Sequence, residues 1–315
     1  MRPTALVLRA LGLGDLLTGV PALRAIARAL PDHHRVLAAP AALAELVALV
    51  DVPGTSGAVI HEVADHRGLA SLPERLHGPD VAVNLHGKGP QSHAALRATR
   101  PGRLVGFADP ATHPDGPPWR AGEHEVARWC RMLAAHGIAC DRAELRIAAP
   151  PAPPDSRVRG ATVVHPGAAS GARRWPAERW AAVAHAEAAT GRTVLLTGGA
   201  DERELAQRVA AAAGLADDAV LAGRTSLREL AAVVAAAARV VSGDTGVAHL
   251  ATALGTPSVV LFGPTAPTEW GPPADDGQHV VLWAGRTGDP HAAEPDPGLL
   301  ALGVDEVNAT LARLP

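Results

Sequence analysis

Four short turns in this sequence carry residue types that bind or activate ligands, and each follows an apolar run and precedes a helical pattern. The first is Gly12-Leu13-Gly14-Asp15, in which two glycines let the backbone bend tightly or approach a ligand. It is not a full dinucleotide-binding fingerprint, because Leu17 stands where the third glycine would be. Asp15 is interpreted either as a carboxylate that faces a ligand cleft or as a cap of the following helix.

The second turn, residues 165–176, reads HPGAASGARRWP and has the composition of an anion cradle. Backbone N–H groups at a helix start, together with the positive end of the helix dipole, favour a diphosphate. The guanidinium of Arg173 adds a bidentate donor for phosphate oxygens, and Ala168 and Ser170 lie in the same turn. The alternative is a solvated pair, Arg173 and Arg174, on an ordinary loop.

The third turn, residues 198–202, reads GGADE and offers carboxylates that can accept hydrogen bonds from ribose hydroxyls. Asp201 could instead cap the helix that follows. Residues 223–227 come after the next apolar run, and their main-chain groups, with Leu227, can hold the edge of a base.

The fourth turn, residues 243–249, reads GDTGVAH and is the most specific of the four. Asp244 and Thr245 stand at a helix start, where the N–H groups of Thr245 and Gly246 can meet phosphate oxygens. His249 is one turn further along and can contact the same phosphates, or it can be a half-buried histidine that the fold itself satisfies. Ligands of open α/β sheets bind beyond the carboxyl ends of strands, where these turns are expected.

The elements that must position these turns alternate between short apolar runs and helical patterns, which predicts an α/β fold. In the first half, strands are predicted at residues 5–9, 35–38, 58–61, 81–85 and 103–106. An apolar stripe with helical spacing predicts a helix that has Pro21 in its first turn, and a second helix is expected at 123–136.

A proline-dense segment at 149–155, APPAPPD, is stiff and extended and predicts a domain boundary. Beyond it the predicted strands are 161–165, 193–197, 219–221, 240–242 and 258–262, and the predicted helices are 176–189, 202–213, 227–237 and 246–254. A loop is expected at 285–298. We therefore expect one Rossmann-like domain at 1–152, a second at 153–302, and a helix at 303–315 that packs back on the first domain.

The composition excludes several classes of function. A net charge of −3 with interspersed signs lacks the basic stripe that nucleic-acid binding needs. No apolar segment approaches the length of a membrane span, so a cytoplasmic protein is expected. Cys130 and Cys140 are too few for a disulfide framework or a thiolate metal site and are expected as buried apolar side chains. A zinc site at His61 and His66 fails because these histidines are at i and i+5 rather than i and i+4.

Taken together, the turns resemble the heptosyltransferase family, glycosyltransferase family 9, whose members transfer heptose and related sugars from nucleotide-diphosphate donors. The resemblance is carried by the opening strand and Gly-Asp turn at 6–21, the HPGA and Arg-Trp-Pro block at 165–176, and the DTG-x-x-H to Phe-Gly-Pro block at 244–264. It implies a GT-B fold, in which two Rossmann-like domains face a cleft, and an inverting reaction that needs no metal.

The resemblance also implies roles for single residues. Asp15, in an acceptor-side N-terminal domain, matches the catalytic base, and the C-terminal domain matches the part that binds the nucleotide sugar. The implied donor-binding positions are Ala168, Ser170, Arg173, Glu202, Leu227, Asp244, Thr245, Gly246 and His249. The implied acceptor-binding positions are Gly14, His86, Lys88 and Gln91. Ala168 and Ala169 replace threonines of some relatives, which removes hydroxyl donors from the phosphate site.

The predicted reaction is a single displacement: Asp15 deprotonates an acceptor hydroxyl, while Arg173 and the helix start near Thr245 stabilise the departing diphosphate. By the resemblance the donor is ADP-linked, and the acceptor is a saccharide or a lipid-linked cell-envelope glycoconjugate. We expect no cofactor, no metal, and at most peripheral contact with the inner face of the membrane. Two alternatives stay open, namely an epimerase that acts on the donor alone and a catalytically silent protein that binds a nucleotide sugar.

Overall fold

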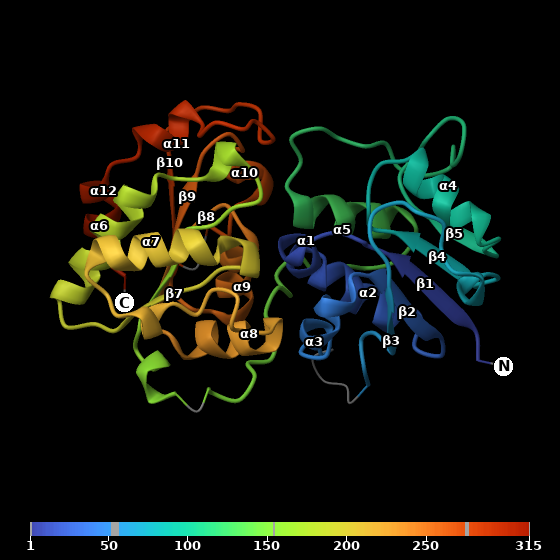
Figure 1. Ribbon diagram of the computed structural model, residues 1–315. Coiled ribbons are helices and arrows are strands. Elements are labelled where there is room, and N and C mark those ends of the chain that lie inside the picture. Colours follow the sequence, from blue (N-terminus) through green and yellow to red (C-terminus); the bar gives the residue numbers. More distant parts are fainter. Residues whose placement is uncertain (1, 52–56, 154, 275–276, 315) are drawn as a thin grey trace. The chain divides into compact units, whose positions relative to one another are not determined.

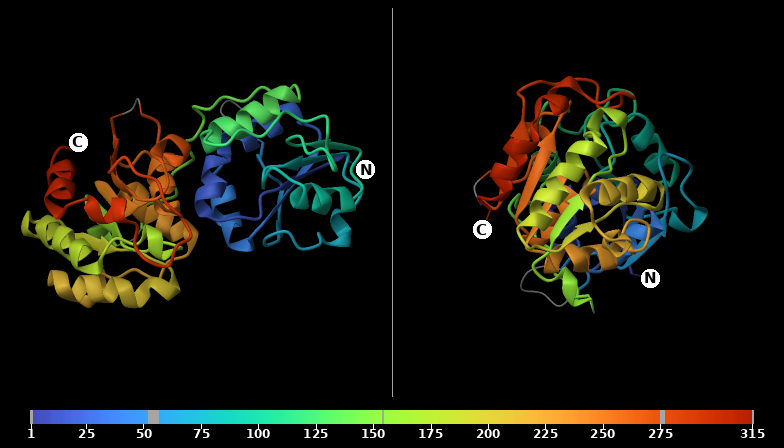
Figure 2. Two further views of the ribbon diagram at one scale, coloured as in Figure 1. Left: turned by 90° about the horizontal axis from the view of Figure 1, so that it is seen from above. Right: turned by 60° about the vertical axis from the view of Figure 1, so that its left-hand side comes forward.

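The chain folds as two compact units, Met1–Ala148 and Ala149–Pro315, in a computed structural model that describes residues 2–51, 57–153, 155–274 and 277–314. Each unit contains one five-stranded parallel sheet with helices on both of its faces (Figures 1 and 2). The predicted α/β class is therefore confirmed. Pro154 in the predicted boundary segment and Pro315 at the end of the predicted closing helix lie outside the described residues.

The first unit has the strand order β3-β2-β1-β4-β5. Its strands are β1 (Thr4–Leu8), β2 (His34–Ala39), β3 (Glu62–Asp65), β4 (Val81–Asn84) and β5 (Arg103–Val105). Its helices are α1 (Leu13–Thr18), α2 (Val20–Ala29), α3 (Ala44–Val47), α4 (Gln91–Ala98) and α5 (Glu125–Ala135), with short 3-10 turns at Ala41–Leu43 and Glu74–Leu76. Pro21 lies in the first turn of α2, as predicted.

The second unit has the strand order β10-β9-β8-β6-β7. Its strands are β6 (Thr162–His165), β7 (Val194–Leu196), β8 (Arg239–Gly243), β9 (Ser258–Phe262) and β10 (His279–Trp283). Its helices are α6 (Ala177–Ala189), α7 (Arg203–Ala213), α8 (Leu227–Ala236), α9 (Gly246–Leu254), α10 (Pro267–Trp270), α11 (Pro297–Ala301) and α12 (Val304–Leu311). Its 3-10 turns are Ser156–Val158, Gly171–Arg173, Ala200–Glu202 and Asp217–Ala219.

Strand β9 shows why these apolar runs become central strands. Successive side chains of a strand point to opposite faces, so a strand that is covered on both faces is apolar throughout. Val259 and Leu261 join the core beneath α6, α7 and α12, whereas Val260 and Phe262 pack with Ala248 of α9 on the other face. The sheet is thereby fixed in the middle of the unit, and its loops carry the polar residues.

The third strand lies at Glu62–Asp65 and not at the predicted residues 58–61. Arg35, which is buried in β2, explains the difference. Its guanidinium donates hydrogen bonds to the carbonyls of Ala58 (2.7 Å) and Val59 (2.8 Å), so this segment cannot use those groups in a ladder. Strand pairing with β2 begins only at Glu62.

Two further element predictions are corrected in the second unit. The predicted strand 219–221 makes a single bridge, between Leu196 and Val220, after the 3-10 turn Asp217–Ala219. Strand β10, which pairs along its length with β9, was missed. Its sequence, HVVLW between Gly277 and Gly285, is a short β-branched run of the kind that predicts a strand.

The closing helix α12 packs within the second unit. Val307 and Leu311 are fully buried against α6 and β9, and Arg239 of β8 donates a hydrogen bond to the Leu311 carbonyl at 2.6 Å. The apolar face of this helix therefore completes the core of its own unit, and the packing of residues 303–315 on the N-terminal domain stays a prediction.

The prediction for the two cysteines is also corrected, because Cys130 and Cys140 form a disulfide. Cys130 is in the middle of α5, and the turn through Gly137, whose φ is +82°, leads the chain back to Cys140. The pair closes this turn instead of supplying two separate apolar side chains. None of the helices in the described ranges is long and apolar enough to cross a bilayer.

Candidate functional site

The candidate acceptor-side residues lie at the switch point of the first sheet. The chain runs outward from β1 to β2 and β3 and then returns to pair β4 on the other side of β1. The loops that follow β1 and β4 therefore diverge at the carboxyl edge, which is where open α/β sheets bind ligands. Gly14 and Asp15 follow β1, and His86, Lys88 and Gln91 follow β4.

Asp15 occupies the first turn of α1 and is partly exposed. Its Oδ2 accepts a hydrogen bond from the Gly12 N–H at 3.1 Å, so Asp15 supports the helix start from the third helical position, whereas Gly12 is the N-cap residue. This bond engages one of the two carboxylate oxygens, so capping holds the group in place without excluding a reaction at the other oxygen.

A buried cation, Arg9, holds the turn that carries Asp15. The Arg9 guanidinium donates hydrogen bonds to the carbonyls of Asp15 and Leu85, and to the Thr18 hydroxyl at 3.1 Å. It also pairs with Glu125 of α5 at 3.3 Å, and the two side chains are 0% and 5% exposed. Arg9 thus ties the loop after β1 to the loop after β4.

Glu125 is in turn held by other partners on α5. It accepts hydrogen bonds from Trp129 Nε1 at 2.6 Å and from the Arg128 guanidinium. The Arg9 guanidinium also lies 5.1 Å from the centre of the Trp129 ring. Sequence reasoning missed this network, although a charged residue at the end of a strand that is otherwise wholly apolar was a signal that it needed a buried partner.

His86 is a neutral hydrogen-bond donor at this edge. Burial lowers its pKa to about 4, with smaller contributions from Arg9 and His66. Its Nδ1 accepts from the Ala10 N–H at 3.2 Å, so in the neutral ring the proton is on Nε2. Asn84 shapes the same loop by accepting from the His86 N–H at 3.0 Å and donating to Ser92 at 2.9 Å.

The other predicted acceptor residues differ in exposure. Lys88 and Gln91 are exposed, and Gln91 is the first residue of α4. Gly14, in the first turn of α1, is half-buried. These residues share the carboxyl edge with Asp15 and His86 through the two loops that Arg9 connects.

The second sheet has an equivalent switch point between β6 and β8, and it brings two of the predicted turns together. Arg173, after β6, donates a hydrogen bond to the carbonyl of Asp244, after β8, at 3.3 Å. Its Nε lies 3.3 Å from the hydroxyl of Ser170, which donates to the Pro290 carbonyl at 2.6 Å. The predicted anion cradle and the predicted helix start are thus one structural site.

The carboxyl of Asp244 is buried, with 7% of the residue exposed. Burial raises its pKa to about 6, and the Arg173 guanidinium and a hydrogen bond with Thr265 only partly oppose this. Burial thus disfavours the charged form of this carboxyl group, and groups with such shifted pKa values recur at functional sites.

Helix α9 begins beside Asp244. The N–H groups in the first turn of a helix have no partner within the helix, and they favour anions. Thr245 precedes the helix without a side-chain capping bond, and its hydroxyl is buried with no partner among the described residues. Gly246 is the first residue of the helix, and His249, one turn on, is half-buried and packs edge-on against Trp270 at 6.0 Å between ring centres.

Glu202 ends the 3-10 turn Ala200–Glu202, and its carboxylate approaches His165 at the end of β6. Its Oε2 accepts from the Gly199 N–H at 2.8 Å and lies 3.9 Å from His165 Nε2. A Cβ on Gly167 would meet the Glu202 carboxylate at 2.0 Å, so a larger residue there would displace this side chain. Burial lowers the pKa of His165, while Glu202 raises it.

The two remaining predicted donor residues are Ala168 and Leu227. Ala168 is buried, and its carbonyl accepts a hydrogen bond from Arg174 at 2.9 Å. Leu227 is half-buried at the start of α8, where the Ser226 side chain caps the helix. Among the described residues, no group of three or more His, Cys, Asp or Glu side chains is arranged to hold a metal ion.

Among known proteins, one similar sequence is lipopolysaccharide heptosyltransferase 1 of Pseudomonas aeruginosa, which is 37% identical over 158 residues. The matched part is 46% of this chain and 41% of that relative, so the chain spans about two fifths of the relative's length. This match therefore does not assign the activity of the whole relative to this chain.

Two solved structures share the fold over almost the whole chain. E. coli ADP-heptose lps heptosyltransferase II has a TM-score of 0.76 at 19% identity and covers 98% of this chain and 97% of its own. The iron-containing dodecameric glycosyltransferase TibC of enterotoxigenic E. coli has a TM-score of 0.62 at 14% identity and covers 99% of this chain and 76% of its own. The two successive Rossmann-like units are thus those of the GT-B fold.

The model of glycosyltransferase family 9 (heptosyltransferase) matches residues 120–295, which is more than half of the chain. This range contains the 165–176, 198–202 and 243–249 turns, whose side chains were placed above. The chain therefore belongs to glycosyltransferase family 9, the heptosyltransferase family.

Proposed function

We propose that this chain is an inverting glycosyltransferase that moves a heptose or a related sugar from an ADP-linked donor to a hydroxyl of a saccharide or cell-envelope glycoconjugate. Membership of the family supports the reaction class, and the heptosyltransferase names of its relatives support the sugar. The observation that carries the proposal is the convergence of Arg173, Asp244 and the start of α9 at one switch point.

The second unit binds the donor in this proposal. Arg173 and the N–H groups of Thr245 and Gly246 contact the diphosphate, with His249 beside them, because a guanidinium and a helix start both favour phosphate oxygens. Asp244 accepts hydrogen bonds from hydroxyls of the donor sugar. Glu202 accepts from the ribose, and Leu227 contacts the base. Ser170 and Ala168 shape the phosphate loop.

Asp15 in the first unit is the general base. It takes the proton of the acceptor hydroxyl as the oxygen attacks the anomeric carbon, and the nucleotide diphosphate leaves from the opposite face, which inverts the configuration. General-base catalysis is typically worth about 10²- to 10⁴-fold in rate. Stabilisation of the leaving diphosphate by preorganised donors contributes about 10²- to 10³-fold for each donor.

The acceptor contacts Gly14, His86, Lys88 and Gln91 in this proposal. The Nε2–H of His86 donates to a hydroxyl or ring oxygen, and the Lys88 ammonium attracts an acidic group of a lipid-linked acceptor. Residues 1–152 form the acceptor-side domain, and residues 153–302 form the donor domain. Such an enzyme would work in the cytoplasm, with at most peripheral contact with the inner face of the membrane.

The proposed reaction needs no metal, because the leaving diphosphate is stabilised by Arg173 and the α9 N–H groups. Transfer should therefore be unchanged after dialysis against a chelator. A loss of activity that one added metal ion restores would contradict this part of the proposal.

The experiment that tests the function is product analysis with a panel of nucleotide sugars and truncated glycoconjugate acceptors. Formation of a glycosylated acceptor and free ADP, only when both substrates are present, is the expected result. Conversion of the donor sugar without an acceptor would identify an epimerase. Donor binding, detected as a rise in melting temperature, without turnover on any acceptor would identify a silent binding protein.

A further inference from the structure

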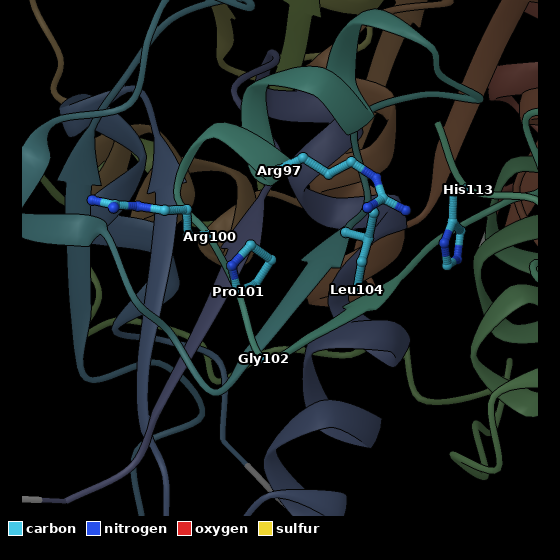
Figure 3. Close-up of a pocket in the computed structure, with 6 residues that line it drawn as sticks. All are labelled: Arg97, Arg100, Pro101, Gly102, Leu104 and His113. Carbon is cyan, nitrogen blue, oxygen red and sulfur yellow. The ribbon is translucent and has the colours of Figure 1, made fainter. Parts of the chain in front are cut away.

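The first unit contains a pocket that the proposed transfer reaction does not use. It is lined by six residues from the end of α4, the turn that follows it, strand β5 and the loop beyond: Arg97, Arg100, Pro101, Gly102, Leu104 and His113 (Figure 3). Its volume is about 380 Å³, within the range of small-molecule sites. Asp15 and His86 follow β1 and β4 at the carboxyl edge, whereas this pocket starts at the amino end of β5.

The lining of this pocket is cationic. Arg97 and Arg100 are exposed, have no ion-pair partner within the described residues, and none of the six lining residues is acidic. The Arg97 side chain extends past Leu104 toward His113, while that of Arg100 extends the other way (Figure 3). The planar guanidinium of Arg97 can donate two parallel hydrogen bonds to an oxyanion.

His113 supplies a second polar group in the wall. It is 7% exposed, and its Nε2 is buried with no hydrogen-bond partner in the described chain. Its ring stacks on His136 at 5.8 Å and meets the edge of His93 at 5.6 Å, so neighbouring rings hold it in place. An unpaired buried nitrogen is unusual in a native protein and calls for an explanation.

The surroundings of His113 lower its pKa. Burial lowers the pKa of this imidazole, as do His136 and Arg97, while Asp115 raises it. The ring is therefore neutral near pH 7, and a neutral imidazole still offers one N–H donor. The side chains of Leu104 and Pro101 give the pocket an apolar side beside these donors.

We propose that this pocket binds the phosphate group of a small phosphorylated molecule, with Arg97 and His113 as its hydrogen-bond donors and Leu104 and Pro101 against its organic part. A guanidinium fork, an unpartnered buried imidazole and the absence of lining acids define the anion site. The pocket is larger than a lone oxyanion requires, which accounts for the organic part. None of these residues takes part in the proposed sugar transfer, so the two proposals are independent.

The test is a methyl NMR titration of the full chain with inorganic phosphate, glucose 1-phosphate and glucose. The Leu104 methyl signals, assigned by their loss in Leu104→Ile, report this pocket alone and not a phosphate site in the second unit. Saturable shifts with the two phosphates and none with glucose are expected. Tighter binding of glucose 1-phosphate would support the organic part, whereas equal affinity for both phosphates would overturn that part and leave the anion site.

Two arginine variants complete the test. Arg97→Ala should weaken phosphate binding by at least about tenfold, because a charge-assisted hydrogen bond is lost. Arg142→Ala removes the same charge from an exposed position of the same unit and should bind as the wild type does. If no probe moves the Leu104 signals, or if Arg97→Ala and Arg142→Ala bind phosphate equally well, the proposal is wrong.

Discussion

Replacing Asp244 with asparagine tests whether this buried carboxyl is kept for ligand binding although it destabilises the fold. Burial raises its pKa from 3.8 to about 6. One unit of pKa corresponds to about 1.4 kcal/mol, so the charged carboxylate lowers the free energy of unfolding by about 3 kcal/mol above pH 6. An asparagine at this position would keep the shape of the side chain and remove that charge, so Asp244→Asn should stabilise the free protein near pH 7.

The direction of the pH dependence follows from which state binds the proton more tightly. The folded protein holds the Asp244 proton up to about pH 6, whereas the unfolded chain releases it near pH 3.8. The stability that this group contributes is therefore complete below pH 3.8 and is lost as the pH rises to about 6. Urea unfolding of both proteins between pH 4 and pH 8 should show a difference that is near zero in acid and reaches about 3 kcal/mol at neutral pH.

Glu123→Gln provides a control of opposite sign. A hydrogen bond from Arg131 lowers the pKa of Glu123, so this carboxylate stabilises the fold at neutral pH and loses that effect as the pH falls through its folded pKa. Glu123→Gln should thus be the less stable protein at pH 7. An Asp244→Asn protein that is less stable than the wild type at pH 7, or a difference that does not change with pH, would refute the reasoning.

Two other substitutions probe the two switch points separately. Arg9→Met should lower the free energy of unfolding by about 3 kcal/mol, because the carbonyls of Asp15 and Leu85 lose their donor and Glu125 loses one of its cations. It should also lower kcat while donor affinity stays the same, and wild-type kcat in a folded variant would contradict the positioning role. Arg173→Ala should weaken ADP binding about tenfold or more in a calorimetric titration, whereas Arg208→Ala, at an exposed ion pair of the same unit, should not. Equal ADP affinity in the two variants would remove Arg173 from the donor site.

Most of the architecture could be predicted from the sequence because the two sheets are buried on both faces. In strands such as β9 an apolar run, Val259 to Phe262, lies between Pro257 and Gly263, so the position of the strand follows from the local sequence. The turns that follow β6 and β8 were found for the same reason. The contact between Arg173 and Asp244 depends on the order of the strands in the sheet. That order could not be predicted from the sequence.

Several of the failures share a physical cause, which is contact between residues that are far apart in the chain. Arg35 donates hydrogen bonds to carbonyls of the segment that was predicted as the third strand. Arg9 pairs with Glu125, which is 116 positions away in the sequence. The disulfide of Cys130 depends on a turn at Gly137 that no local pattern required. The apolar face of α12 was recognised, but its partners α6 and β9 were not.

The general-base role of Asp15 is tested most directly by comparing Asp15→Asn with Asp80→Asn in steady-state transfer and donor titration. Asp80 is a matched control, since its carboxylate also accepts one backbone N–H, from Thr4 at 2.7 Å, but lies at the amino end of the same sheet. Asp15→Asn should lower kcat by about 10²- to 10⁴-fold with unchanged donor affinity, while Asp80→Asn turns over as the wild type does. An Asp15→Asn enzyme with wild-type kcat would contradict the account.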